Sequence, residues 1–188
     1  MIHGLVRLPL TLLLFGSCIA AGSERPDGAG SVQMPSWPCL SPGADKIVFE
    51  WRDDIWEVAV GGGRAVRLTA HPARDSYPQY SPDGETLFFC SSRSGALQLF
   101  SMPAEGGPAT QHTYHSEGGK LESVAPDGRT ALLRGLRDEP GFRPTRLIQV
   151  NLRKDAPERY LFNEKGTSAR WLPDGSGVLF CREGEQLY

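Results

Sequence analysis

The sequence has no run of lysine and arginine and almost no net charge. Its 188 residues carry 20 Lys and Arg against 22 Asp and Glu, a formal charge of -2 at pH 7. Affinity for nucleic acids comes mainly from basic side chains that neutralise phosphates. The composition therefore argues against a nucleic-acid-binding protein.

The short motifs that mark common catalytic and cofactor sites are also missing. There is no H-E-x-x-H, no P-loop and no G-x-G-x-x-G. The stretch 166–170 comes nearest to the serine-hydrolase pattern G-x-S-x-G and fails at Arg170, where a sharp turn needs glycine. No cysteines have the C-x-x-C spacing of a zinc site. We therefore predict no catalytic residue, no metal site and no cofactor.

No apolar stretch approaches the roughly 20 residues that span a bilayer, so we predict no transmembrane span. The apolar run 8–15 follows Arg7 and precedes small residues up to Gly22. This order is typical of a secretory signal peptide, which we place at 1–21. The chain is then exported to the periplasm or cell envelope, with a flexible linker at 22–35 that is rich in Gly, Ser and Pro.

The four cysteines fall into two groups. Cys18 ends a segment, 15–18, that resembles a bacterial lipobox, so it is a candidate for lipidation and the chain for a lipid anchor. After export three remain, and an odd number cannot all pair internally. Cys90 and Cys181 each end an apolar triplet, which predicts two buried thiols at equivalent repeat positions, and Cys39 is the third.

Glycine and proline are abundant, with 22 Gly and 15 Pro, which indicates many turns and few long helices. A Pro-Asp-Gly motif, or a close variant of it, begins at Pro42, Pro82, Pro126 and Pro173. Pro favours the first corner of a tight turn and Gly the corner with positive φ, so each copy predicts a hairpin. The spacing of about 40 to 47 residues is typical of the four-stranded blades of a propeller.

The segments around these turns have the patterns of strands. The apolar runs 47–49, 87–89, 131–133 and 178–180 follow the turns and are expected to be covered on both faces by neighbouring blades. We predict an all-β partial β-propeller at 36–188, with about three and a half four-stranded blades. The repeats lie near 37–69, 77–113, 121–162 and 169–188. Because the fourth copy stops within its third strand, we expect a fragment whose partners include the remaining blades or C-terminal part.

Several polar residues could be interpreted as a metal, anion or acid–base site, but each has a structural explanation. His71, His112 and His115 occupy loop positions, two of them repeat-equivalent, without a carboxylate at ligand spacing. The glycines at 61–63 could form an anion nest, yet a hairpin turn explains them better. Three recurring aspartates are expected to bond their own turn backbone and not to act as acids or bases. These are Asp83, Asp127 and Asp174.

Aromatic and charged clusters leave two alternatives open. Trp37, Tyr77 and Trp171 lie beside the turns, and we expect blade-to-blade packing in preference to a ligand-stacking surface. The long loop of the third repeat is expected to be solvated, with a substrate or partner contact as the alternative. Its charged residues are Arg137, Asp138, Glu139, Arg143 and Arg146.

Particular residue strings carry a family resemblance. They include Asp53-Asp54-Ile55-Trp56, Ser81-Pro82-Asp83-Gly84 and the segment 102–107. The sequence resembles the WD40-like repeats of TolB and, more closely, the N-terminal six-bladed propeller of tricorn-type proteases. In such relatives the propeller filters or guides peptides, while catalysis lies in a C-terminal serine peptidase region with a PDZ-like module.

The resemblance implies a non-catalytic propeller portion of an exported tricorn-like protease, which binds or gates peptides and by itself hydrolyses nothing. Two alternatives remain. One is a TolB-like periplasmic scaffold that binds envelope proteins. The other is the propeller of a prolyl-oligopeptidase-type hydrolase. Peptides or proteins are the expected partners in each case.

Overall fold

The structure is a computed structural model that describes residues 35–136, 146–152, 158–182 and 185–187. The predicted signal peptide at 1–21, Cys18, all but the last residue of the linker, and the loop residues 137–145 lie outside this part of the chain. Among the described residues there are strands, turns and loops but no helix. The strands are β1 (Ser36–Leu40), β2 (Lys46–Trp51), β3 (Asp54–Ala59), β4 (Val66–Arg67), β5 (Asp75–Tyr80), β6 (Thr86–Ser91), β7 (Gln98–Pro103), β8 (Thr110–Gln111), β9 (Lys120–Val124), β10 (Thr130–Gly135), β11 (Arg146–Asn151), β12 (Arg159–Trp171), β13 (Val178–Arg182) and β14 (Glu185–Leu187).

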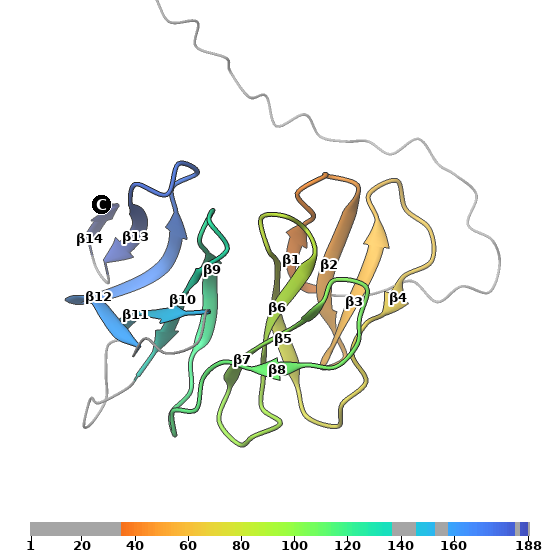
Figure 1. The fold of residues 1–188 in the computed structure, drawn as a ribbon, viewed down its shortest axis with the longest axis horizontal. Helices are drawn as coiled ribbons and strands as arrows, with labels where there is room; N and C mark the ends of the chain where they lie inside the picture. The colour runs from red at the N-terminus through yellow and green to blue at the C-terminus, as the bar shows by residue number, and fades with distance from the viewer. Residues whose placement is uncertain (1–34, 137–145, 153–157, 183–184, 188) are drawn as a thin grey trace, which may run out of the picture. The chain divides into compact units, whose positions relative to one another are not determined.

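The strands form consecutive antiparallel blades, as the repeats predict. β1 to β4 pair in chain order in one sheet, and β5 to β8 pair in the same way in the next. Figure 1 shows these two sheets side by side, with β9 to β14 beyond them. The described part of the chain is therefore an all-β partial propeller whose ring is not closed.

The predicted turn chemistry is present at the Pro-Asp-Gly copies. Asp83 Oδ1 accepts the backbone N–H of Glu85 at 3.0 Å. Asp127 and Asp174 each accept the N–H two residues further on, at 2.9 and 3.0 Å. Gly84 has a φ of 78°, in the left-handed region that favours glycine. Each aspartate therefore stabilises the hairpin in which it lies.

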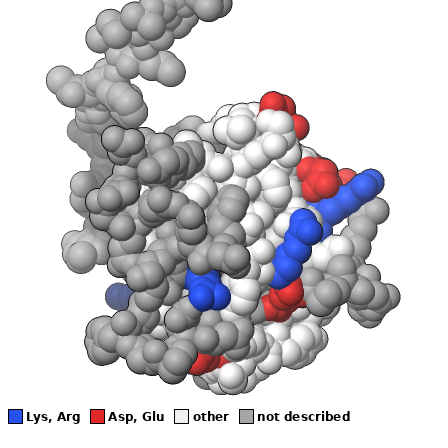
Figure 2. Space-filling view, turned by 90° about the vertical axis from the view of Figure 1, so that its left-hand side faces the viewer, with Lys and Arg blue, Asp and Glu red and all other residues white. Residues whose placement is uncertain are grey.

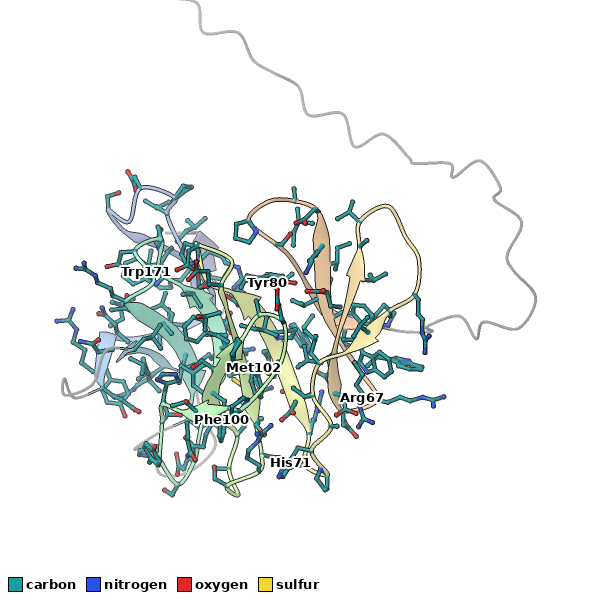
Figure 3. All side chains as sticks on the ribbon, turned by 45° about the vertical axis from the view of Figure 1, so that its right-hand side comes forward. Arg67, His71, Tyr80, Phe100, Met102 and Trp171 are labelled. Carbon is teal, nitrogen blue, oxygen red and sulfur yellow. The ribbon has the colours of Figure 1, made fainter. Side chains whose placement is uncertain are left out.

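Apolar side chains fill the space between successive blades. Val48 and Ile55 of the first blade belong to one buried cluster with Phe89 of the second. Figure 3 shows Tyr80 and Met102, members of the same cluster, in the interior between the two sheets. Removal of this apolar surface from water is the main favourable contribution to blade association.

The expectation that the apolar runs are covered on both faces is correct for the second and third blades. It is wrong for part of the first, where Ile47 is half-buried, and for part of the fourth. In β13, Phe180 is buried against the third blade, but Leu179 is 44% exposed. The register places Leu179 where Phe88 and Leu132 are buried in the blades before it. Figure 2 views the molecule from the side of β12 to β14, where uncharged described residues surround a few basic and acidic side chains.

The third and fourth repeats share one strand, which the sequence did not predict. β12 pairs with β11 through its first half and with β13 through its second, so β9 to β14 form one sheet. Between the earlier blades, Thr69 and Thr113 instead accept the backbone N–H groups of Ile55 and Leu99, both at 2.9 Å, and the chain leaves the sheet there. The register puts Phe162 at this position in the third repeat, and phenylalanine has no hydroxyl to accept that bond.

The buried hydroxyl of Thr113 predicts a measurable loss of stability. Thr113 is fully buried, and its Oγ1 also donates to Gln98 Oε1 at 2.7 Å. Thr113→Val keeps the shape and leaves two buried polar groups unpaired, so we expect the free energy of unfolding to fall by about 1 to 3 kcal/mol in urea titrations. Thr110→Val, on the exposed side of β8, is the control and should change stability by less than about 0.5 kcal/mol. Equal effects of the two substitutions would contradict the assigned role of the hydroxyl.

Candidate functional site

The first strands of the four repeats surround a groove of about 470 Å³. Residues of β1, β5, β9 and β12 line it, together with one residue of β10. We call this hollow the inner groove. Because it draws on all four repeats, its residues lie far apart in the sequence and come together only when the blades pack.

The same backbone irregularity recurs in three of these strands. Trp37, Tyr77 and Ser168 have φ values of 53°, 55° and 53°, which is uncommon for residues other than glycine. The pairing of each strand with its neighbour shifts register at this point, as in a β-bulge. A bulge redirects side chains, and here all three residues line the inner groove.

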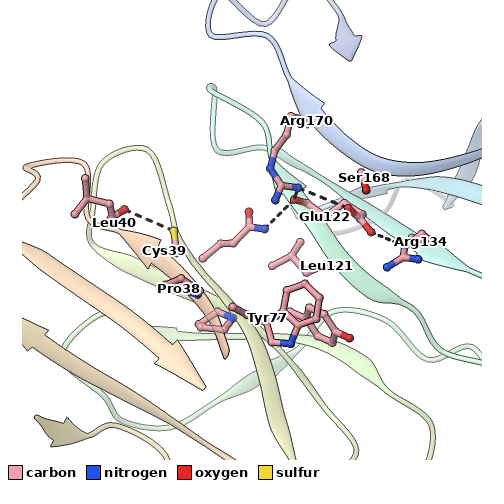
Figure 4. Close-up of a pocket in the computed structure, with 12 residues that line it drawn as sticks. Pro38, Cys39, Leu40, Tyr77, Leu121, Glu122, Arg134, Ser168 and Arg170 are labelled. Atoms are coloured by element: carbon pink, nitrogen blue, oxygen red, sulfur yellow. Dashed lines mark hydrogen bonds and ion pairs between the residues drawn. The ribbon is translucent and has the colours of Figure 1, made fainter. Parts of the chain in front are cut away.

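One wall of the groove is aromatic and apolar. The rings of Trp37 and Tyr77 lie 4.5 Å apart between centroids, and Trp37 remains 48% exposed. Pro38 and Pro78 follow these rings in the chain, and Leu121 lies on the same side of the groove (Figure 4). The contact between Trp37 and Tyr77 confirms blade-to-blade packing, but the exposed half of Trp37 is also free to stack on a ligand.

Trp171 does not share the environment of those two aromatic residues. By strand register Trp171 corresponds to Leu40 and Tyr80, which lie three residues after Trp37 and Tyr77 in their strands. Trp171 packs beside the cluster between the third and fourth blades, and its indole Nε1 is buried without a hydrogen-bond partner. The sequence interpretation that grouped it with Trp37 and Tyr77 was therefore wrong in register.

The opposite wall is charged. Glu122 is 7% exposed and forms ion pairs with Arg134, at 2.5 Å, and with Arg170, at 3.6 Å. Figure 4 shows this group with Ser168 beside it, facing the apolar residues. The side chain of Arg170 is 64% exposed, and its Nη1 donates to the carbonyls of Glu122 and Ala169. The two walls give the groove an apolar platform beside a cationic edge.

The first strands are also linked to one another by side chains. Gln79 and Ser123, each three positions before a turn proline, accept a backbone N–H of the next blade. The bonds run from Val124 N–H to Gln79 Oε1 at 3.2 Å and from Trp171 N–H to Ser123 Oγ at 3.3 Å. The Gln79 amide also donates to the Glu122 carbonyl at 2.9 Å, and Arg170 donates to the same oxygen. These bonds fix the blades around the inner groove.

The histidines considered as metal ligands form local hydrogen bonds instead. Nδ1 of His71 accepts the Ala73 N–H at 3.0 Å, and Nδ1 of His115 accepts the Glu117 N–H at 3.2 Å. Among the described residues, no group of three His, Cys, Asp or Glu side chains is placed to hold a metal ion. The two equivalent histidines therefore cap equivalent loops.

In the part of the chain that the structure describes, His112 contacts a serine hydroxyl in the way that a general base contacts a nucleophile. Its Nε2 lies 2.7 Å from the Ser101 hydroxyl. Burial lowers the His112 pKa, which favours the neutral ring. The ring packs against Phe88, with 6.0 Å between centroids, and neither Ser101 nor His112 lines the inner groove. The pair thus stabilises the outer part of the second blade.

The remaining candidates are structural. Gly62 and Gly63 have positive φ and form the expected turn between β3 and β4. Cys39, Cys90 and Cys181 are unpaired, and Cys90 is fully buried, as predicted, whereas Cys181 is half-buried. Burial raises the pKa of the Cys90 thiol to about 12, so it is an unreactive thiol.

The sequence analysis did not identify the inner groove, because the residues that form it share a position in each repeat and not a residue type. Gln79 and Ser123 have one role but no common chemistry apart from an accepting atom. The aromatic residues Trp37 and Tyr77, each followed by proline, were the sequence signal of the bulge.

No helix in the described part of the chain is long and apolar enough to cross a membrane.

Comparison with known proteins gives consistent matches. The family model for the tricorn protease N-terminal beta propeller domain matches residues 34–187. Tricorn protease homolog 1 of Streptomyces coelicolor is 37% identical over 73 residues, which is 39% of this chain and 7% of that protein. Putative tricorn protease homolog 2 of the same organism is 35% identical over 111 residues, 55% of this chain and 9% of that protein. The chain thus spans less than a tenth of these two relatives.

A solved structure supports the fold. The putative TolB from Agrobacterium tumefaciens superposes with a TM-score of 0.68 at 24% identity, covering 81% of this chain and 60% of that one. At this identity the likeness concerns the architecture alone.

Proposed function

Since this chain belongs to the family of tricorn protease N-terminal β-propeller domains, we propose that it is a non-catalytic propeller that binds or gates peptides at the inner groove. The observation that carries the proposal is the half-exposed Trp37 on one wall of the groove, with the exposed side chain of Arg170 on the other. Tryptophan and arginine are enriched among the residues that dominate protein and peptide binding. A groove that offers both fits a peptide better than a small polar metabolite.

The proposal assigns no hydrolysis to this chain. Within the described residues, the Ser101–His112 pair lies outside the lining of the groove. Acyl transfer requires a nucleophile, a base and an oxyanion site that converge on one carbonyl. The inner groove offers Ser168 without a histidine among its lining residues.

We further propose that the protein works outside the cytoplasm. The signal-like order of residues 1–21 supports export, and Cys18 remains the candidate for a lipid anchor. The intact mass of the protein recovered from cells tests both points. Loss of the first 21 residues supports simple export, an added diacylglyceryl mass on Cys18 supports the anchor, and a full-length mass contradicts both.

The binding proposal predicts a saturable interaction with unstructured peptides. We expect a fluorescein-labelled casein digest to increase in anisotropy with the purified chain, without any change in its mass spectrum. Trp37→Ala should weaken binding by at least about tenfold, because a truncated hot-spot aromatic typically costs 2 kcal/mol or more. Tyr114→Ala is the matched control, since Tyr114 is 76% exposed and does not line the groove.

Two results would contradict this function. Peptide cleavage that follows the protein through purification and is lost in the Ser101→Ala variant would show an enzyme. Equal binding by the parent chain and by Trp37→Ala, with both folded, would place the peptide elsewhere.

A further inference from the structure

Several backbone groups along the strands that line the inner groove are already occupied or lack a donor. Peptides often bind as an added strand, which needs alternating free N–H and C=O groups along an edge. At β9, the Gln79 side chain donates to the Glu122 carbonyl and accepts from the Val124 N–H, so both backbone groups are occupied. At β1 and β5, Pro38 and Pro78 have no N–H to offer.

The bulges interrupt these edges further. Trp37 and Tyr77 stand where the strand register shifts, so the backbone groups on either side are not evenly spaced. A regular strand cannot pair across such a break. Recognition at the groove must therefore come from side chains.

The apolar wall suits a proline-rich helix of the polyproline II type. Such segments have no internal hydrogen bonds and dock against aromatic-lined grooves, with little loss of conformational entropy. The half-exposed Trp37, held by Tyr77 at 4.5 Å between centroids, supplies a rigid aromatic platform. The two prolines that follow these rings stiffen the platform.

The charges near this aromatic platform favour a peptide that carries an acidic side chain. Arg134 and Arg170 line the groove, and Lys120 Nζ lies 5.7 Å from the centre of the Tyr77 ring. The carboxylate among the lining residues is Glu122, which is buried between the two arginines. The rim thus has more positive than negative charge, and its most open cation is Arg170.

We propose that the inner groove binds a proline-containing segment in the polyproline II conformation, with an acidic side chain that contacts Arg170. The proline rings pack on Trp37 and Tyr77. This inference rests on the proposed function and names the class of peptide. The acidic group is the side chain of an Asp or Glu within the peptide. Its carboxylate replaces water at the exposed part of the Arg170 side chain.

Three labelled peptides of equal length, about ten residues each, test the inference by anisotropy with the full chain. One is proline-rich with a central aspartate, the second has lysine in place of that aspartate, and the third alternates valine and threonine to favour a strand. We expect the first to bind at least about tenfold more tightly than the other two. Trp37→Ala should abolish that preference, and Arg170→Gln should remove the discrimination between aspartate and lysine.

The outcomes separate the two proposals. If the strand-forming peptide binds best and its binding depends on Trp37, peptide binding stands and the polyproline inference is overturned. If none of the three binds, both proposals fail. Binding of the proline-rich peptide that is unaffected by Trp37→Ala also overturns the inference. Tyr114→Ala and circular dichroism of each variant control for loss of the fold.

Discussion

Replacing Phe89 with alanine is expected to lower the free energy of unfolding by about 3 to 5 kcal/mol, as measured by urea titration of the purified chain. Phe89 is fully buried in the cluster between the first and second blades. Its ring stacks on Phe100 with 6.0 Å between centroids, and the Arg93 guanidinium lies 5.5 Å from its centre. Alanine would leave a cavity that two rigid sheets cannot close, so both burial and contact energy are lost.

Leu179→Ala provides the comparison for that prediction. Leu179 also belongs to a second strand of a blade, but it is 44% exposed. We expect its truncation to cost less than about 1 kcal/mol, since little apolar surface is lost. A Phe89→Ala loss no larger than that of Leu179→Ala would show that the first two blades are not held together through this ring.

The parts of the fold that follow local rules could be predicted from the sequence. Asp83 and Gly84 specify their hairpin through bonds and backbone angles within four residues, so the motif alone was sufficient. The burial of Cys90 also followed from its apolar neighbours. The exposure of Leu179 did not, because it depends on which surface lies opposite and not on its own run of residues.

The inner groove and the shared strand depend on contacts between distant residues. Gln79 reaches β9 across more than 40 positions, and nothing in its own neighbourhood marks it as an acceptor for Val124. The strand register places Phe162 at the position of Thr69 and Thr113 in the earlier repeats, and this equivalence can be recognised only once the strands are paired. A pattern search detects repeated residue types, whereas these features repeat a position and change the residue.

Arg93→Met is expected to destabilise the chain by about 3 to 5 kcal/mol, because it leaves a buried carboxylate without its cation. Asp75 is fully buried, and both of its oxygens accept from Arg93 Nη2, at 3.0 and 2.9 Å. Methionine keeps the apolar contact with Phe100 that the guanidinium makes at 4.9 Å from the ring centre, so the loss is mainly electrostatic. Lys46→Met is the control: Lys46 pairs with Glu57 at 3.1 Å but is 43% exposed, and we expect a change below about 1 kcal/mol.

The double variant Asp75→Leu with Arg93→Met separates a buried charge from a poorly filled core. With both charges removed, no ion remains at this position in the interior, and leucine has the same branched arrangement of heavy atoms as the aspartate that it replaces. We therefore expect the double variant to be more stable than Arg93→Met alone by about 1 kcal/mol or more, and the coupling to appear in the double-mutant cycle. If the double variant is instead less stable than the single one, Asp75 contributes through the shape of its side chain, and the ion pair is not the source of the effect.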